Sequence, residues 1–398
     1  MSRELRITPD EYARRRDRVR AELERRGLAA LVQFGALRNF YLTGFAHSTT
    51  ERPIALVVPV DGPVAALLPL LEEDHVRQHV PEIEWLKVYP EYPDLRHPML
   101  WLVELLTEMG LASKPLGVDS DGYGGTYGYR GPTLSSLLPD ARVEPMRDWL
   151  DGMRCIKSPA EIDLIRQCVP FGNLVVDMIR EAVQPGVNEI AVSLRAMADA
   201  SADALRQLGP DYRGYDNGSI PVRGGFVGGP KTALPHPIDD ATPLREGDVL
   251  IPWGSGQLGG YHSELERTMI LGKPSDKQRY FFEHMLEAQQ TALDAIRPGI
   301  ACSEVNEAVR RYVDTHGLQA YVRHHSGHGL GMEIHESPFL DSGDHTVLKP
   351  GMCFSCEPGL YVPGIGGFRH SETVVVTQTG REILTTYPRD LESLIIPC

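Results

Sequence analysis

A repeated set of short motifs constrains the fold of this chain more than any other feature of its sequence. Three motifs occur in the same order in both copies, and each is separated from its copy by roughly 110 residues. They are Ala182–Val187 with Ala295–Ile300, Leu244–Gly247 with Leu348–Gly351, and Gly259–Tyr261 with Gly366–Phe368. A spacing this large excludes a solenoid and predicts two half-domains related by a pseudo-twofold axis, with a site in the cleft between them.

The two copies differ at positions where ionisable side chains occur. The repeat places Glu357 across from Trp253 and Glu264 across from Ser371. Each half therefore supplies one carboxylate where a symmetric site would have two. We expect this asymmetry to determine the chemistry of the cleft.

The composition is typical of a large globular protein and excludes some partners. The chain has 398 residues, of which 42% are hydrophobic and 24% charged, so two domains with a large core are expected. The net charge of -14 argues against a nucleic-acid partner, because neutralising phosphates requires a basic surface. No apolar run approaches the ~18 residues of a membrane span. The first residues also lack the apolar core of a signal peptide, so we expect a cytoplasmic protein. We expect its partner to be a small-molecule substrate.

The pattern of hydrophobic residues predicts an α+β protein with two domains. An α/β domain is expected over residues 1–152, and its predicted strands and helix are 30–34, 55–59, 65–69 and 99–109. A second domain over residues 153–398 contains the repeat. Each half should form two helices followed by strands, with the helices covering one face of a curved antiparallel sheet. The expected strand pairs are 249–253 with 261–271, and 352–357 with 368–377.

Three helix starts carry the signature of a capping box. Thr8, Ser158 and Ser275 are each followed three residues later by Glu or Gln, and the first two are also followed directly by proline. A helix is therefore expected to begin at each of these positions.

One strand-like segment concentrates ionisable residues on a single face. Strand alternation places His262, Glu264 and Glu266 on the same side of the segment Tyr261–Thr268. Three such residues are costly on one face unless that face is wet or paired. A solvated edge strand is the alternative, but the repeat directs this face towards Ser371 in the cleft.

Other candidate residues lie in distinctive local contexts. His328 lies between glycines in a segment that also contains His335, and this combination favours a functional role. His236 lies between prolines that stiffen its loop. Glu357 ends an apolar strand, where a buried carboxylate needs a cationic partner, a metal or a proton. Arg52 precedes a strand and is either a surface residue or a bidentate ligand for an anionic group.

The chain resembles the creatinase, prolidase and aminopeptidase P family over nearly its whole length. The resemblance rests on Asn39–Phe45, Ile156–Ile162, Gly327–Gly331 with His335-Glu336, and Glu357–Tyr361. It implies the pita-bread catalytic domain behind a creatinase-like N-terminal domain. It also implies a homodimer.

The peptidases of this family hold two metal ions with two Asp, one His and two Glu. The resemblance maps these positions to Trp253, Glu264, His328, Glu357 and Ser371. Two adjacent divalent ions need bridging carboxylates to offset their repulsion, and Trp and Ser cannot bridge. A normal dinuclear site is therefore not expected.

The metal-free creatinases match the candidate set more closely. Their His, Glu, His, Glu set maps to His236, Glu266, His328 and Glu357, and all four residues match. Glu266 discriminates best, because peptidases usually carry Thr at that position.

Three further positions refine this comparison. Arg52 matches a creatinase arginine that binds the substrate carboxylate across the dimer. Phe339 stands where creatinases have a second such arginine, which argues against creatine itself. His335, with the glutamate that follows it, is a peptidase-like feature.

The leading hypothesis is a metal-independent, creatinase-like hydrolase of a non-peptide C–N bond in a small cationic or zwitterionic substrate, with no cofactor. Glu266 and Glu357 would hold the cationic group, His236 would transfer a proton, and His328 would orient the substrate. The other expected substrate-binding residues are Arg52, Trp253, His335, Glu264 and His262. Trp253 would fill the vacated metal position and offer a cation–π face.

Two alternatives remain. In the first, the chain is a metal-dependent Xaa-Pro dipeptidase, or a lyase, whose single divalent metal is held by His262, Glu264, His328 and Glu357. In the second, it is a non-catalytic binding module of the same fold. The retention of two His and three Glu that converge on one cleft argues against this second alternative.

Overall fold

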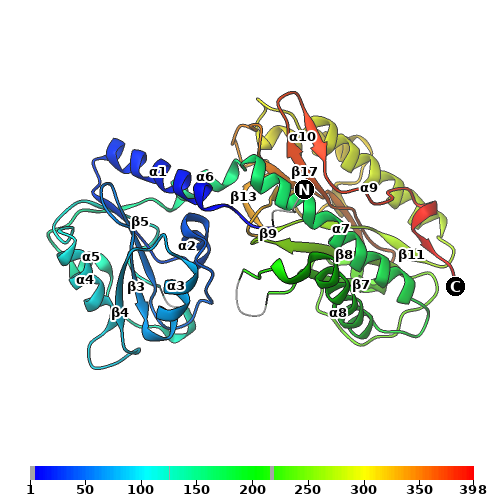
Figure 1. Ribbon diagram of the computed structural model, residues 1–398. Helices are drawn as coiled ribbons and strands as arrows, with labels where there is room; N and C mark the ends of the chain where they lie inside the picture. The colour runs from blue at the N-terminus through cyan, green and yellow to red at the C-terminus, as the bar shows by residue number, and fades with distance from the viewer. Residues whose placement is uncertain (1–4, 125, 216–218) are drawn as a thin grey trace. The chain divides into compact units, whose positions relative to one another are not determined.

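The structure is a computed structural model that describes residues 5–124, 126–215 and 219–398 (Figure 1). These residues form two compact units. The N-terminal unit comprises residues 7–153 with Tyr215, and the C-terminal unit comprises Leu5, Arg6 and residues 154–214 and 219–398. No helix in the described part of the chain has the length and apolar character needed to cross a membrane.

The N-terminal unit contains a mixed six-stranded sheet in the order β4-β3-β2-β1-β5-β6. The pairs β1–β2 and β2–β3 are antiparallel, and the other neighbours are parallel. The strands are β1 (Ala30–Gln33), β2 (Ala55–Pro59), β3 (Ala65–Pro69), β4 (Trp85–Tyr89), β5 (Leu116–Val118) and β6 (Val143–Pro145). The helices are α1 (Pro9–Arg26), α2 (Ala36–Thr43), α3 (Glu73–His79), α4 (Pro98–Glu108), α5 (Leu134–Leu137) and α6 (Arg147–Cys155), and α6 runs on into the C-terminal unit.

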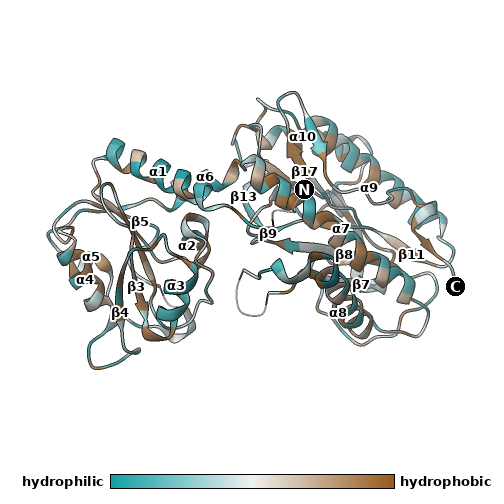
Figure 2. Cartoon of the chain, in the orientation of Figure 1, coloured by the Kyte–Doolittle hydropathy of each residue, from teal (hydrophilic) through white to brown (hydrophobic). Residues whose placement is uncertain are grey.

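The three strands and the helix expected in this unit agree with β1, β2, β3 and α4 to within about one residue. Every residue of β1, β2 and β3 is buried. Figure 2 shows β3 as mainly hydrophobic, whereas α1 contains many hydrophilic residues. Continuous apolar runs are typical of strands that are covered on both faces, which explains why the sequence pattern located them well.

Acidification is expected to destabilise the N-terminal unit through His47. The imidazole is buried and stacked on Phe45, and burial lowers the pKa of His47 to about 4. The unfolded chain takes up this proton near pH 6.5, so the stability that depends on neutral His47 is lost as the pH falls from about 6.5 to about 4, by roughly 3 kcal/mol. Unfolding should be followed from pH 7 to pH 4, with His47→Phe giving a flatter profile. Identical profiles for the two proteins would contradict this assignment.

The C-terminal unit consists of two sheets with helices packed against them (Figure 1). Its helices are α7 (Pro159–Ala182), α8 (Glu189–Leu208), α9 (Asp276–Ala295) and α10 (Cys302–Thr315). One sheet has the order β10-β8-β11-β19, with β7 and β9 also paired to β8, and the other has the order β13-β12-β14-β17-β18. The strands of the first are β7 (Val222–Gly228), β8 (Val249–Leu258), β9 (Tyr261–His262), β10 (Leu265–Glu266), β11 (Met269–Leu271) and β19 (Ile395–Ile396). Those of the second are β12 (His328–Gly329), β13 (Glu336–Phe339), β14 (Cys353–Cys356), β17 (Glu372–Val376) and β18 (Arg381–Ile383), and a separate hairpin pairs β15 (Gly359–Val362) with β16 (Gly366–Arg369).

Two helices of this unit, α7 and α9, begin where the sequence signals predicted. Ser158 and Ser275 each form a complete capping box, with side chain and backbone bonded reciprocally three residues apart. In the N-terminal unit, α1 also follows Thr8 and has proline in its first turn, but the Thr8 side chain makes no capping hydrogen bond.

The internal repeat is confirmed by equivalent turns in the two halves. Gly186 N donates to Leu244 O at 2.8 Å, and Gly299 N donates to Leu348 O at 2.9 Å. Both glycines adopt a positive φ, of 92° and 91°, which only glycine takes up readily. The first motif of each copy therefore joins two helices, and its glycine is bonded to the start of the second motif.

The segment 261–271, expected as one strand, is divided into β9, β10 and β11. Its register against β8 is nevertheless constant, since Gln257 faces His262, Gly254 faces Leu265 and Leu250 faces Met269. Between β9 and β10 the backbone N–H of Gly256 donates to the Ser263 hydroxyl instead of to a backbone carbonyl, which interrupts the ladder. Because no residue is inserted, alternate residues of the segment still share a face.

The two halves meet beside this segment. Glu266 and Ser371 form an isolated antiparallel bridge, with N–H to O distances of 3.2 and 3.1 Å. The fully buried Arg267 reinforces the bridge by donating to the carbonyl oxygens of both residues. The Glu372 carboxylate balances the charge of Arg267 at 2.7 Å. The pseudo-twofold relation of the halves thus places the ionisable residues of both copies at one junction.

Candidate metal site

Three potential metal ligands converge next to the bridge between the halves. Glu264 precedes β10, His328 begins β12, and Glu357 follows β14 directly. One ligand atom from each lies within 4.8 Å of the others, and all three residues are buried. His328 Nε2 is 3.1 Å from Glu357 Oε1 and 3.8 Å from Glu264 Oε2.

Close backbone packing fixes His328 in this position. A Cβ on Gly327 would lie 2.1 Å from Ser355 O, and one on Gly329 would lie 2.4 Å from Glu336 O. Glycine on both sides of His328 therefore lets the neighbouring strands approach. His328 Nδ1 lies 3.0 Å from Gly329 O, which leaves Nε2 directed at the carboxylates.

The charges in the cluster perturb one another strongly. Burial and the neighbouring carboxylates Glu357 and Glu266 raise the pKa of Glu264 to about 8. Burial opposes ionisation of His328, but the hydrogen bond to Glu357 and the charges of both acids prevail and raise the pKa of His328 to about 9. Burial would raise the pKa of Glu357, but His328 and Arg369 outweigh it and hold that pKa well below its usual range. The cluster therefore stabilises added positive charge.

A second group of residues adjoins the cluster. Arg369, at the end of β16, donates from Nε and Nη2 to the two carboxylate oxygens of Glu266. Its Nη1 donates to the Tyr361 hydroxyl at 3.0 Å, and the same hydroxyl lies 2.7 Å from His324 Nε2. Arg369 Nε also lies 3.7 Å from Glu357 Oε2. Glu266 is thus neutralised by a residue of the chain itself.

The segment after His328 supports the site from the other side. The exposed His335 ring stacks on His328 with a centroid separation of 3.8 Å and an interplanar angle of 16°. The next residue, Glu336, is buried and paired with Lys157 at 2.5 Å and with Arg154 at 2.7 Å. The ion pairs of Glu336 therefore position the ring that covers His328.

The remaining candidates are distributed around this centre. His262 is buried in β9 on the same face as Glu264, but it is not part of the group of three converging ligands found among the described residues. Trp253 is half-buried in β8, directly opposite Glu266. His236 is exposed, and its charge contributes to the lowered pKa of His335, although burial and the charge of His328 contribute more.

Three further residues are not among the ligands. Arg52 belongs to the N-terminal unit, where it is paired with Glu51 and Glu91. Phe339 contacts the ring of His325 at a centroid distance of 5.7 Å. His370 is completely buried against Phe282 of α9.

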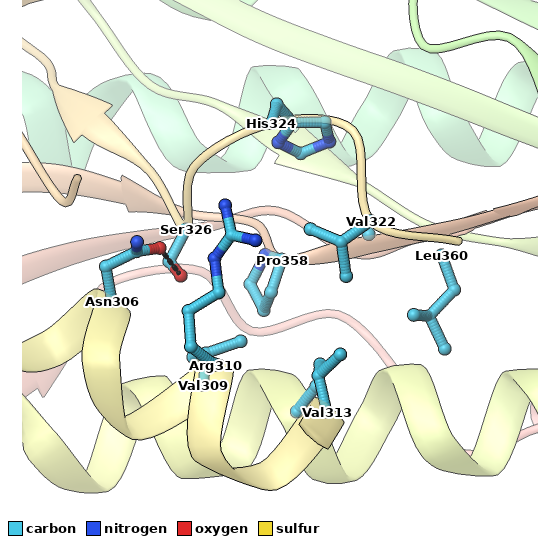
Figure 3. Close-up of a pocket in the computed structure, with 11 residues that line it drawn as sticks. Asn306, Val309, Arg310, Val313, Val322, His324, Ser326, Pro358 and Leu360 are labelled. Carbon is cyan, nitrogen blue, oxygen red and sulfur yellow. Dashed lines mark hydrogen bonds between the residues drawn. The ribbon is translucent and has the colours of Figure 1, made fainter. Parts of the chain in front are cut away.

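A small cavity behind the site is too small for a substrate. It lies between α10 and the segment before β12, and its lining includes Asn306, Arg310, His324 and Leu360 (Figure 3). Its volume of about 10 Å³ accommodates about one water molecule. Asn306 and Ser326 are hydrogen-bonded to each other at one side of it at 2.7 Å, and Ser326 O accepts from Glu357 N at 2.8 Å. The cavity therefore adjoins the backbone that carries Glu357 but offers no binding site.

The fold and this ligand set define a member of a metallopeptidase family. Residues 163–378 match metallopeptidase family M24, and residues 15–156 match the creatinase/prolidase N-terminal domain. The chain belongs to family M24 and has the two-domain pita-bread fold that its sequence motifs predicted.

Several dipeptidases are similar to this chain over most of its length. It is 32% identical over 395 residues to the probable dipeptidase PepE of Mycobacterium tuberculosis, covering 98% of each chain. It is 28% identical over 325 residues to the Xaa-Pro dipeptidase of Pyrococcus furiosus, covering 81% of this chain and 88% of that one. The solved structure of dipeptidase PepE from Mycobacterium ulcerans matches with a TM-score of 0.79 and 29% identity, over 99% of this chain and 100% of the other.

Two expectations from the sequence are therefore wrong. A metal-independent, creatinase-like hydrolase of non-peptide C–N bonds is contradicted by relatives that are dipeptidases of a metallopeptidase family. The expectation of no cofactor is contradicted by the same family and by the convergence of Glu264, His328 and Glu357. The physical reason lies in Glu266, whose carboxylate is engaged by Arg369 instead of being open to a cationic substrate.

Sequence reasoning missed Arg369. The signal was available, because the repeat that aligns Tyr261 with Phe368 also aligns His262 with Arg369. An ionisable residue at the same position in both copies indicates a place in the site.

Proposed function

We propose that this chain is a metal-dependent dipeptidase that cleaves Xaa-Pro dipeptides. The observation that carries the proposal is the convergence of one histidine and two glutamates, with their ligand atoms within 4.8 Å of one another. Carboxylate and imidazole ligands suit Zn²⁺, Mn²⁺ and similar ions. Three protein ligands with further positions open are typical of catalytic rather than structural metal sites. The names of the relatives supply the substrate class.

The donor set fits a divalent ion. Glu264 and Glu357 provide two negative charges, and His328 provides a neutral nitrogen once it has lost its proton. Two carboxylates balance the charge of one divalent ion, whereas Glu266 is already balanced by Arg369. When bound, the ion would polarise the scissile carbonyl and make an attacking water more acidic.

The chain's own residues would handle the protons and orient the substrate. His335 stacks on His328 and has an exposed edge, and burial together with the charge of His328 lowers its pKa, so it is neutral near pH 7. A neutral imidazole in this position can accept a proton from water and return it to the proline nitrogen as the C–N bond breaks. The exposed His236 lies near enough to His335 to influence its pKa.

Removal of metal is expected to abolish hydrolysis. Chelator-treated protein should not release proline from Ala-Pro, and Mn²⁺, Co²⁺ or Zn²⁺ should restore the activity. Proline release from Ala-Pro would be quantified before and after metal is added back. Hydrolysis of Ala-Ala, measured as alanine release, would serve as the matched comparison without proline. Full activity in the presence of excess EDTA would overturn the proposal.

Two further properties stay predictions from the sequence. A homodimer is expected from the family resemblance, with Arg52 of one chain serving the site of the other. A cytoplasmic location is the second.

A further inference from the structure

We infer that this site binds a single divalent ion, because Trp253 and Ser371 stand where a second ion would need carboxylates and Arg369 supplies a fixed positive charge. The inference deepens the proposed function and rests on it. Three structural features support it independently: the engagement of Glu264, the position of Trp253 and the presence of Arg369.

Glu264 presents its two oxygens to different partners. Its Oε1 accepts a hydrogen bond from the Ser371 hydroxyl at 2.7 Å, while its Oε2 is the atom that faces His328. Ser371 is fully buried and belongs to the other half, so this contact is held by the bridge between the halves. A carboxylate that bridges two ions commonly offers one oxygen to each. Ser371 lacks a carboxylate, and its hydroxyl competes with a second ion for Oε1 of Glu264.

Trp253 lies on the face that the ligands share. The backbone of Gly254 and Gly256 packs against α7, where a Cβ would approach within 2.2 Å of Gly172 O and 2.1 Å of Cys168 O. Alternation therefore directs Trp253 to the opposite face, where it is paired in register with Glu266. The indole offers an N–H donor and no ligand atom. The position that the repeat pairs with Glu357 thus contributes bulk instead of charge.

Arg369 is a permanent cation within the site. Its guanidinium is paired with Glu266 and lies 3.7 Å from Glu357 Oε2. When all three carboxylates of the site are ionised, they carry three negative charges, and Arg369 with one divalent ion balances them. A second divalent ion would leave two uncompensated positive charges in a buried site, which is strongly unfavourable. Charge balance therefore limits the site to one ion.

The number of bound ions tests the inference directly. Chelator-treated full-length protein would be saturated with Mn²⁺ and desalted, and bound manganese would be measured by elemental mass spectrometry. Electron paramagnetic resonance at low temperature would show whether the ions are isolated or coupled. We expect one manganese per chain and the six-line spectrum of an isolated ion. Two manganese ions per chain with an exchange-coupled spectrum would overturn the inference and leave the proposed dipeptidase activity intact, whereas no bound manganese would overturn both.

A paired substitution assigns the effect to particular residues. Trp253→Asp combined with Ser371→Glu supplies two carboxylates at the positions in question, and the manganese content should rise from one towards two per chain. Trp253→Phe is the matched control and should keep one. A folded double variant that still holds one ion would overturn the assignment to these two side chains. If the double variant does not fold, the manganese content and spectrum of the unaltered protein still decide the number of ions.

Discussion

Glu357→Gln is expected to weaken metal binding by at least about 100-fold and to abolish measurable dipeptide hydrolysis. Loss of a residue that only supports a metal ligand typically costs 10–100-fold in affinity, and Glu357 is a ligand itself. The amide keeps the size of the carboxylate but removes its charge, and with it the partner that holds His328 Nε2 at 3.1 Å. Manganese binding by titration calorimetry and initial rates on Ala-Pro would measure the two effects.

The fold should survive this substitution. The backbone N–H of residue 357 bonds to Ser326 O, and that contact does not depend on the side chain. Glu287→Gln, at an exposed position on α9, is a matched control that removes one carboxylate from the same unit. Metal affinity and turnover of Glu357→Gln equal to those of this control would rule out the proposed ligand set.

Glu336→Gln is expected to destabilise the C-terminal unit by roughly 3–5 kcal/mol, because it leaves a buried lysine without its charge partner. Lys157 is completely buried, and although burial opposes its ionisation, Glu336 keeps its pKa above the ordinary value. The pKa of Glu336 is held low by Lys157 and Arg154 in spite of burial. In thermal unfolding the change should lower Tm by roughly 10 °C.

Replacing both partners is the informative control. In Lys157→Met combined with Glu336→Met, neither charge remains buried, and apolar replacement of a buried pair is often close to neutral. Arg154 keeps its contact with Glu333 at 2.8 Å in both variants. A double variant as unstable as Glu336→Gln would show that the pair acts through packing rather than charge. Because Glu336 positions His335, both variants should also bind metal more weakly at a temperature where they remain folded.

Much of the fold was accessible from the sequence because its signals are local or repeated. Capping boxes located α7 and α9, and fully apolar runs located β1, β2 and β3. The repeat, a comparison of the chain with itself, predicted that Glu264 and Ser371 would lie across from each other, and their side chains are 2.7 Å apart. These features depend on neighbouring residues or on equivalence between the two halves.

The chemistry of the site was less accessible because it depends on which charges meet in space. Counting carboxylates showed that two expected ligands are absent, and the convergence of Glu264, His328 and Glu357 entered only the single-metal alternative. Glu266 matched a metal-free set by residue type alone. Its partner, Arg369, lies more than a hundred positions away in the sequence and removes Glu266 from that role. Site assignments from motifs are therefore weakest for charged residues, whose function depends on distant partners.

The junction at which Glu266 pairs with Ser371 has one further consequence. Glu264 comes from the first half of the repeat, and His328 and Glu357 come from the second. An ion held by all three would act as a removable cross-link between the halves, in addition to their backbone bridge. At a concentration about 100 times its dissociation constant, such an ion contributes about 2.7 kcal/mol against unfolding. Metal supply would then govern how long the folded chain survives as well as whether it is active.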